Sequence, residues 1–207
     1  MNVASARRVA AVLLGAFVFG LAMAWLKGSN GGLRDAVGNA SAPWLLLPFL
    51  AGALLSGGPT RGRSLLGGAC AGLLASLIAL AGFYLAESFV LDLGPHPWLT
   101  DLSLTLGAAR FWVQRAFVSG PVFGALGVWW HKRRSLTAAG LVAAVFVLEP
   151  AAWWLYGDVV LGSASSAAYP VLTYPELSLA EIAVGAGGFV LLARYTRRRE
   201  PAPGSAI

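Results

Sequence analysis

The chain has 207 residues, of which 57% are hydrophobic and only 12% are charged. A soluble domain needs more charge to cover its surface, so this composition indicates a polytopic membrane protein. The net charge of +6 does not indicate a nucleic-acid partner, because the basic residues lie in short clusters between apolar segments. Cys70 is the single cysteine, which excludes an intrachain disulfide.

Six apolar segments are long enough, at about 20 residues per crossing, to predict an all-α protein with six transmembrane helices. The predicted spans are 9–26, 43–57, 65–86, 106–130, 136–156 and 177–194, which form one domain over 1–199. We also expect a short interfacial helix around Leu33 to Val37, and a disordered tail over 200–207 because that stretch is rich in Pro, Gly and Ser.

The first apolar segment has two interpretations. The sequence Ala22-Met23-Ala24 resembles the cleavage site of a signal peptide. However, Ala16, Gly20 and Ala24 form a stripe of small residues at four-residue spacing, which is typical of close helix packing in lipid. The stripe favours a retained helix, and it is a predicted contact surface for a membrane protein partner.

The distribution of charge predicts the orientation of the spans. Eleven of the fifteen Lys and Arg residues, but only one acid (Glu200), lie at the N-terminus, in the turns at 61–63 and 131–134, and in the tail. Positively charged segments stay on the cytoplasmic side of a membrane, so we expect both termini in the cytoplasm and a location in the cell membrane.

A faint internal repeat suggests a duplicated helical hairpin, with spans two and three matching spans four and five. Each candidate copy has a Gly-Ala-Leu sequence before its basic turn, at Gly52 to Leu54 and at Gly124 to Leu126. The alternative is that two apolar hairpins with basic turns resemble each other without a common origin.

Three charged residues on three different predicted spans fall at nearly one level: Arg115, Glu149 and Glu181. At about 1.5 Å per residue, each lies about 20 Å along its helix from the cytoplasmic end, in the outer half of the bilayer. An unpaired charge there costs on the order of 3 kcal/mol or more. We therefore expect Arg115 to pair with Glu149 in the adjacent helix, while Glu181 either shares the arginine or stays protonated.

Two tryptophans share helix faces with these charges. Trp112 is three residues before Arg115, and Trp153 is four residues after Glu149. They could form the walls of a pocket for an organic cation or a flat ring. The alternative is that they belong to an aromatic belt at the membrane interface.

The sequence offers no convincing catalytic, metal or cofactor site. Asp92, His96 and Asp101 fall in a loop predicted over 88–105, but one histidine without ligand spacing indicates an ordinary solvated loop. Ser119 has no histidine at its depth, so a serine hydrolase is not indicated.

Two segments resemble a family of small bacterial membrane proteins defined only as a domain of unknown function. They are Asn39 to Gly52 (NASAPWLLLPFLAG) and Gly120 to Gly127 (GPVFGALG). The resemblance implies a membrane location but no activity. In size and topology the chain is also similar to the substrate-binding subunits of energy-coupling vitamin transporters, which dock a partner through small residues on the first helix.

Two functions are favoured from the sequence, and a third, an intramembrane enzyme, would need a nucleophile or metal that the sequence does not show. The first is a solute-binding or transport protein with ligand-binding residues Arg115, Glu149, Glu181, Trp112 and Trp153. The second is a non-catalytic membrane scaffold or accessory subunit whose buried charges only hold helices together. The first predicts a cavity that converges on Arg115 and Glu149, whereas the second predicts tight charge pairs without such a cavity.

Overall fold

The computed structural model describes residues 3–27, 32–55, 65–90, 98–161 and 174–197, and in these ranges the regular structure is entirely helical. The helices are α1 (Val3–Lys27), α2 (Leu33–Asn39), α3 (Ser41–Leu55), α4 (Leu65–Val90), α5 (Trp98–Arg133), α6 (Leu136–Leu161) and α8 (Pro175–Arg197). The prediction of an all-α chain is confirmed for this part of the protein. The tail predicted to be disordered lies outside the described residues.

Four stretches of the described chain are helical, long enough and apolar enough to cross a membrane. They are Ser5–Lys27, Leu33–Leu55, Leu65–Ser88 and Pro175–Thr196. Such stretches are typical of a membrane protein. In α6 the apolar stretch is shorter, Leu136–Ala152, and α5 carries Arg110 and Arg115 in its first half.

The loop predicted over 88–105 is shorter than expected. Helix α4 continues to Val90 and α5 already begins at Trp98, so Asp101 lies on a helix and not in a loop. Asp92 and His96 lie outside the described residues. The error arose because the first residues of α5 are more polar than its apolar middle. Hydropathy alone therefore predicts a start for this helix that is too late in the sequence.

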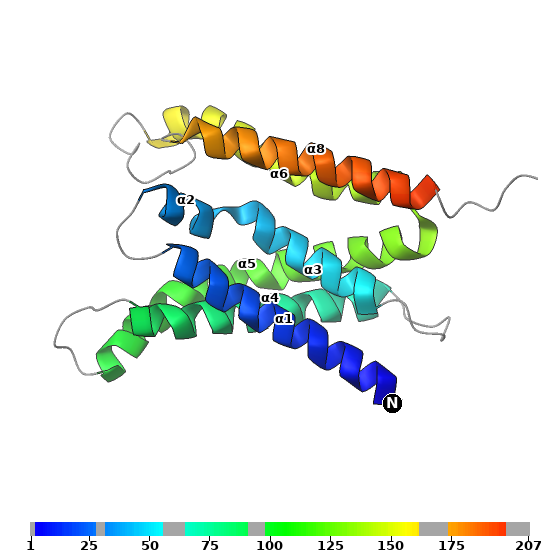
Figure 1. The fold of residues 1–207 in the computed structure, drawn as a ribbon. Coiled ribbons are helices and arrows are strands. Elements are labelled where there is room, and N and C mark those ends of the chain that lie inside the picture. The colour runs from blue at the N-terminus through cyan, green and yellow to red at the C-terminus, as the bar shows by residue number, and fades with distance from the viewer. Residues whose placement is uncertain (1–2, 28–31, 56–64, 91–97, 162–173, 198–207) are drawn as a thin grey trace, which may run out of the picture.

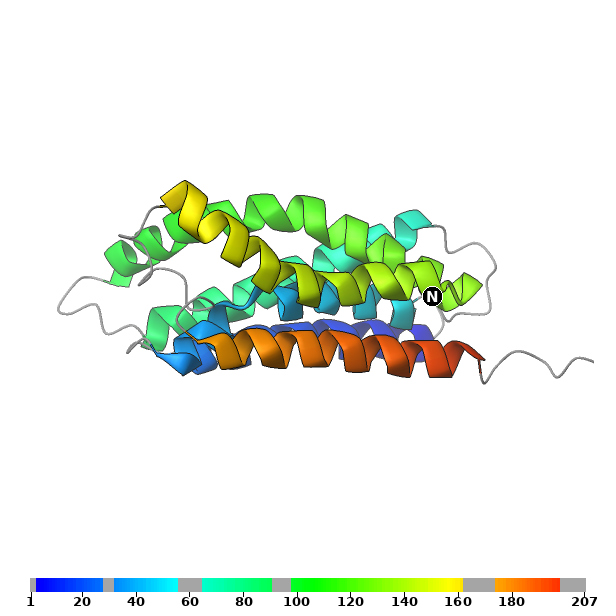
Figure 2. The same cartoon turned by 90° about the horizontal axis from the view of Figure 1, so that it is seen from above.

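The helices form two groups that meet along α3. Figure 1 shows α6 and α8 lying together on one side of the molecule, with α1, α4 and α5 on the other side and α3 between them. The view from above in Figure 2 shows the helices running roughly along one common direction. Helix α8 packs chiefly on α6, whereas α4 contacts α1, α3 and α5.

Glycines bring α5 unusually close to α3 and α4. A Cβ added at Gly124 would collide with the carbonyl oxygen of Gly68 and lie 2.9 Å from the Cα of Gly72, both on α4. A Cβ added at Gly52 of α3 would in turn collide with the carbonyl of Gly124. Helices inside a membrane gain little from burying apolar side chains, so close backbone approach at small residues provides much of their packing energy.

The small-residue stripe of α1 is also used within the chain. Ala16 and Ala24 are buried, and a Cβ on Gly20 would collide with the carbonyl oxygen of Ala79 in α4. The stripe predicted as a surface for a partner protein is therefore covered by α4 of the same chain.

Replacement of Gly124 by alanine tests the glycine contacts. Gly124→Ala places a methyl group between packed backbones, so we expect the free energy of unfolding to fall by about 1–3 kcal/mol. The control is Gly107→Ala on the same helix, where an added Cβ meets nothing within 4 Å. The control should be as stable as the wild type or more so, since alanine favours a helix over glycine by about 0.5–1 kcal/mol. Thermal unfolding in detergent measures both, and equal melting temperatures for the two variants would contradict the packing described.

Candidate functional site

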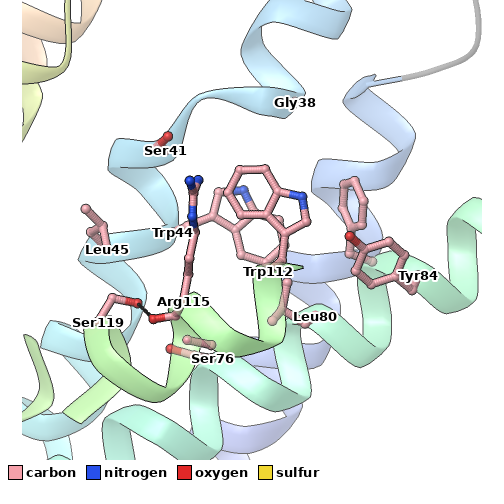
Figure 3. Close-up of a pocket in the computed structure, with 12 residues that line it drawn as sticks. Gly38, Ser41, Trp44, Leu45, Ser76, Leu80, Tyr84, Trp112, Arg115 and Ser119 are labelled. Carbon is pink, nitrogen blue, oxygen red and sulfur yellow. Dashed lines mark hydrogen bonds between the residues drawn. The ribbon is translucent and has the colours of Figure 1, made fainter. Parts of the chain in front are cut away.

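A cavity of about 250 Å³ lies between α3, α4 and α5, close to the start of α3. Figure 3 shows the residues around it, and most of its wall is apolar. The residues that line it are Gly38, Ser41, Trp44, Leu45, Ser76, Leu80, Phe83, Tyr84, Trp112, Arg115, Ala116 and Ser119. Arg115 is the one charged residue in this lining.

Arg115 extends from α5 toward the start of α3, and its guanidinium group lies beside the rings of Trp44 and Trp112 (Figure 3). The guanidinium carbon lies 3.7 Å from the centre of the Phe111 ring and 5.3 Å from that of Trp112. Within the described ranges Arg115 makes no ion pair. Its charge is therefore held by the faces of aromatic rings and is available to an anion.

The aromatic wall of the cavity is braced by three helices. The ring of Trp44 in α3 packs edge-to-face against Phe19 of α1 and Phe83 of α4, with ring centres 5.3 and 5.5 Å apart. Tyr84 packs edge-to-face on Phe83 at 5.2 Å. Such contacts fix the ring orientations, so this wall is preformed. On the other side Trp112 is 42% exposed, and it is the less restrained of the two tryptophans in the lining.

Glu149 binds the N-terminus of α3 instead of pairing with Arg115. The backbone N–H of Ser41 donates to Oε1 of Glu149 at 2.7 Å, and that of Ala42 donates to Oε2 at 2.6 Å. The next residue is Pro43, which has no N–H. Glu149 therefore accepts hydrogen bonds from both backbone N–H groups that precede Pro43 in the first turn of α3. The expected pair of Arg115 with Glu149 was therefore wrong within the described structure: the carboxylate is held by a helix N-terminus.

Glu181 is the most isolated of the three charges. Its residue is only 6% exposed, and neither carboxylate oxygen has a hydrogen-bond partner in the described part of the chain. It lies on α8, within electrostatic reach of Glu149 on α6. An ionised carboxylate without a partner is costly at such a position, so the side chain does not act as a helix clamp.

The structure thus separates the residues that the sequence grouped together. Arg115 and Trp112 line the cavity, whereas Glu149 and Glu181 do not. The side chain of Trp153 lies outside what the structure describes.

Sequence reasoning did not assign Trp44, Ser41 or Ser76 of the lining to the site. Trp44 was identified only as the start of a span, and Ser41 and Ser76 were not singled out. The signal for Trp44 was its position directly after Pro43 at a helix start. Nothing local marks Ser76, because a serine in an apolar helix can equally bond to its own backbone. Ser119, for example, donates to the carbonyl oxygen of Arg115 at 3.0 Å.

The charged residues outside the cavity do not form a metal site in the described part of the chain. No group of three or more His, Cys, Asp or Glu side chains is placed there to hold a metal ion. Lys27 and Glu87 form an ion pair that links α1 to α4, and the Lys27 ammonium also lies 5.4 Å from the ring centre of Phe83. This pair stabilises the braced side of the cavity.

The chain belongs to a family of unknown function, DUF6518, whose model matches residues 2–206. The sequence-based resemblance to a domain of unknown function is confirmed by this match. No curated protein and no solved structure matches the chain.

Glu149→Gln tests the attachment of α6 to the N-terminus of α3. The amide keeps the shape but has only one acceptor oxygen, so one of the two hydrogen bonds is lost and the other is no longer strengthened by a charge. We therefore expect the free energy of unfolding to fall by about 1.5–3 kcal/mol. The control is Glu176→Gln in the first turn of α8, where the acid is exposed and the loss should be smaller. Thermal unfolding in detergent gives the comparison. If Glu149→Gln is no less stable than the control, the carboxylate does not hold α3.

Glu181→Met tests the opposite expectation for the second acid. Methionine has a similar unbranched shape and brings no polar atom that lacks a partner, so stability should be unchanged or rise by up to about 2 kcal/mol. A clear loss of stability, measured alongside Glu149→Gln, would mean that Glu181 has a structural partner after all. An unchanged or raised stability would mean that folding does not require this acid.

Proposed function

Because membership of a family of unknown function assigns no activity, we propose a function from the cavity: the protein binds a small apolar organic anion within the membrane, as a solute-binding or transport protein. The observation that carries this proposal is Arg115, a cation in an apolar cavity with no ion-pair partner in the described structure. Pockets for small molecules are mostly apolar, with a few polar groups that fix the orientation of the ligand.

The charge of the lining selects an anion over a cation. Both acids that could have balanced an organic cation, Glu149 and Glu181, are absent from the cavity wall. The rings of Trp44 and Trp112 supply flat apolar surfaces next to the guanidinium group (Figure 3). An aromatic or aliphatic carboxylate fits this combination, since its apolar part can contact the rings while its oxygens accept hydrogen bonds from Arg115.

We infer that the chain crosses the cell membrane six times with both termini in the cytoplasm. The basic residues support this topology. Figure 1 places the start of α1, the turn from α5 to α6 and the end of α8 at the same end of the molecule. These ends carry Arg7 and Arg8, Lys132 and Arg133, and Arg194. The cavity adjoins the start of α3, toward the opposite end, so its ligand would be held in the outer half of the membrane.

A duplicated hairpin, with α3 and α4 matching α5 and α6, is compatible with one contact. Gly52 and Gly124 are the first residues of the two Gly-Ala-Leu sequences, and they meet each other where α3 crosses α5. Equivalent residues that contact each other are common where repeats pack about a pseudo-twofold axis.

A scaffold role remains the second proposal, and Glu149 is the observation that favours it. Its carboxylate attaches α6 to α3 and does not line the cavity. The same observation does not apply to Arg115, which holds no helix in the described structure. The scaffold role thus explains one of the three intramembrane charges and leaves the cavity without a purpose.

Two probes with the same aromatic ring but opposite charges test the binding proposal. We expect 2-naphthoate to raise the melting temperature of the purified protein, because a ligand at about 100 times its Kd adds about 2.7 kcal/mol of stability. The corresponding cation, (2-naphthyl)trimethylammonium, should not. Arg115→Gln should lose the response to 2-naphthoate, whereas Arg110→Gln, an exposed arginine outside the cavity on the same helix, should keep it. A response to the cation in the wild type, or an unchanged response of Arg115→Gln to the anion, would refute the anion site.

A further inference from the structure

A second hollow adjoins the cavity on the outer face of α3 and α5. It is a groove of about 610 Å³. The residues that line it are Leu45, Phe111, Gln114, Arg115, Val118, Ser119, Val122 and Phe123. Three of these residues, Leu45, Arg115 and Ser119, also line the cavity. The two hollows therefore lie on either side of a shared boundary at Arg115.

The groove is apolar and open to the surroundings of the protein. Phe111, Val118 and Val122 are 49%, 69% and 51% exposed, and they follow one another along one face of α5. An apolar face of this kind on a membrane-spanning helix faces lipid chains rather than water. The cavity, by contrast, lies between α3, α4 and α5.

Arg115 lines both hollows, so a ligand in either of them can place an anionic group against its guanidinium group. Its guanidinium group contacts the Phe111 ring, which belongs to the groove, and lies near the Trp112 ring, which belongs to the cavity. A cation on the outer face of a membrane helix is unfavourable unless an anion or the polar interface is within reach. A ligand whose anionic group binds Arg115 can thus extend into the groove.

The sizes of the two hollows indicate the shape of that ligand. The cavity, at about 250 Å³, is smaller than the roughly 300–1,000 Å³ typical of pockets that enclose a drug-sized molecule. The cavity therefore has room for only one end of a larger amphiphile. The groove has an apolar wall along which a single hydrocarbon chain can lie, so the two together fit a molecule with one anionic head and one chain.

We propose that the site takes single-chain anionic amphiphiles directly from the bilayer, with the anion on Arg115, the head end in the cavity and the chain in the groove. This inference rests on the proposed anion site and adds the class of ligand and its route. The ligand then never has to leave the lipid phase, which explains why the groove opens sideways and why its wall carries no second charge.

Palmitate and 2-naphthoate together test this inference on the full chain in phosphatidylcholine nanodiscs. Palmitate has the carboxylate and a chain for the groove, whereas 2-naphthoate has the same charge but fits within the cavity alone. We expect both to raise the melting temperature of the wild type. Val118→Trp, which fills the groove from an exposed position, should reduce the response to palmitate much more than the response to 2-naphthoate. Val122→Trp, further along the groove, provides an independent second variant.

The control is Val184→Trp, an equally apolar and exposed position on α8 away from both hollows. It should respond to both probes like the wild type. If 2-naphthoate stabilises the wild type and palmitate does not, the lipid ligand is ruled out and the anion site stands. If neither probe has an effect, the proposed function fails as well. If the two groove variants respond to palmitate like Val184→Trp, the chain does not lie in the groove and the inference is overturned.

Discussion

The close contact of α5 with α3 and α4 at Gly124 is the constraint on which the rest of the structure depends. Gly68, Gly72 and Gly120 let the backbones of α4 and α5 meet, and Gly52 does the same for α3. Nearer the start of α5, Trp112 and Arg115 take the place of glycine, and there the cavity lies. The same three helices are thus held together at one level and leave space at another, so the packing itself positions the site.

The two acids Glu149 on α6 and Glu181 on α8 show how environment decides the role of a side chain. Glu149 accepts two backbone hydrogen bonds at the positive end of α3, where a negative charge is favourable. Glu181 has the same chemical group, but it is buried and its carboxylate oxygens have no hydrogen-bond partner in the described part of the chain. One carboxylate therefore contributes to the fold, since it attaches α6 and with it α8 to the rest of the bundle. The other contributes nothing visible to stability.

Arg115 keeps its charge available for a ligand because neither Glu149 nor Glu181 pairs with it in the described structure. The cation lies against Phe111 and near Trp112, and aromatic faces stabilise a positive charge without neutralising it. An anionic ligand would neutralise the charge of Arg115, whereas a salt bridge within the protein would have left no free charge for a ligand. The proposals of an organic anion and of a lipid-derived amphiphile both follow from this one feature, which separates the site from the helix-to-helix contacts of Glu149.

The sequence by itself determined the all-α class and the presence of long apolar helices with charges inside them, because hydropathy and charge are properties of each segment alone. It also identified Arg115 and Trp112, whose helical spacing puts them on one face. The tertiary structure decided which groups meet. Glu149 binds backbone N–H groups at Ser41 and Ala42, more than a hundred residues away, and backbone donors carry no sequence signal. Trp44 and Ser76 enter the cavity only because glycine contacts set how α3, α4 and α5 cross, and the direction of a helix face depends on its neighbours as well as on its own residues.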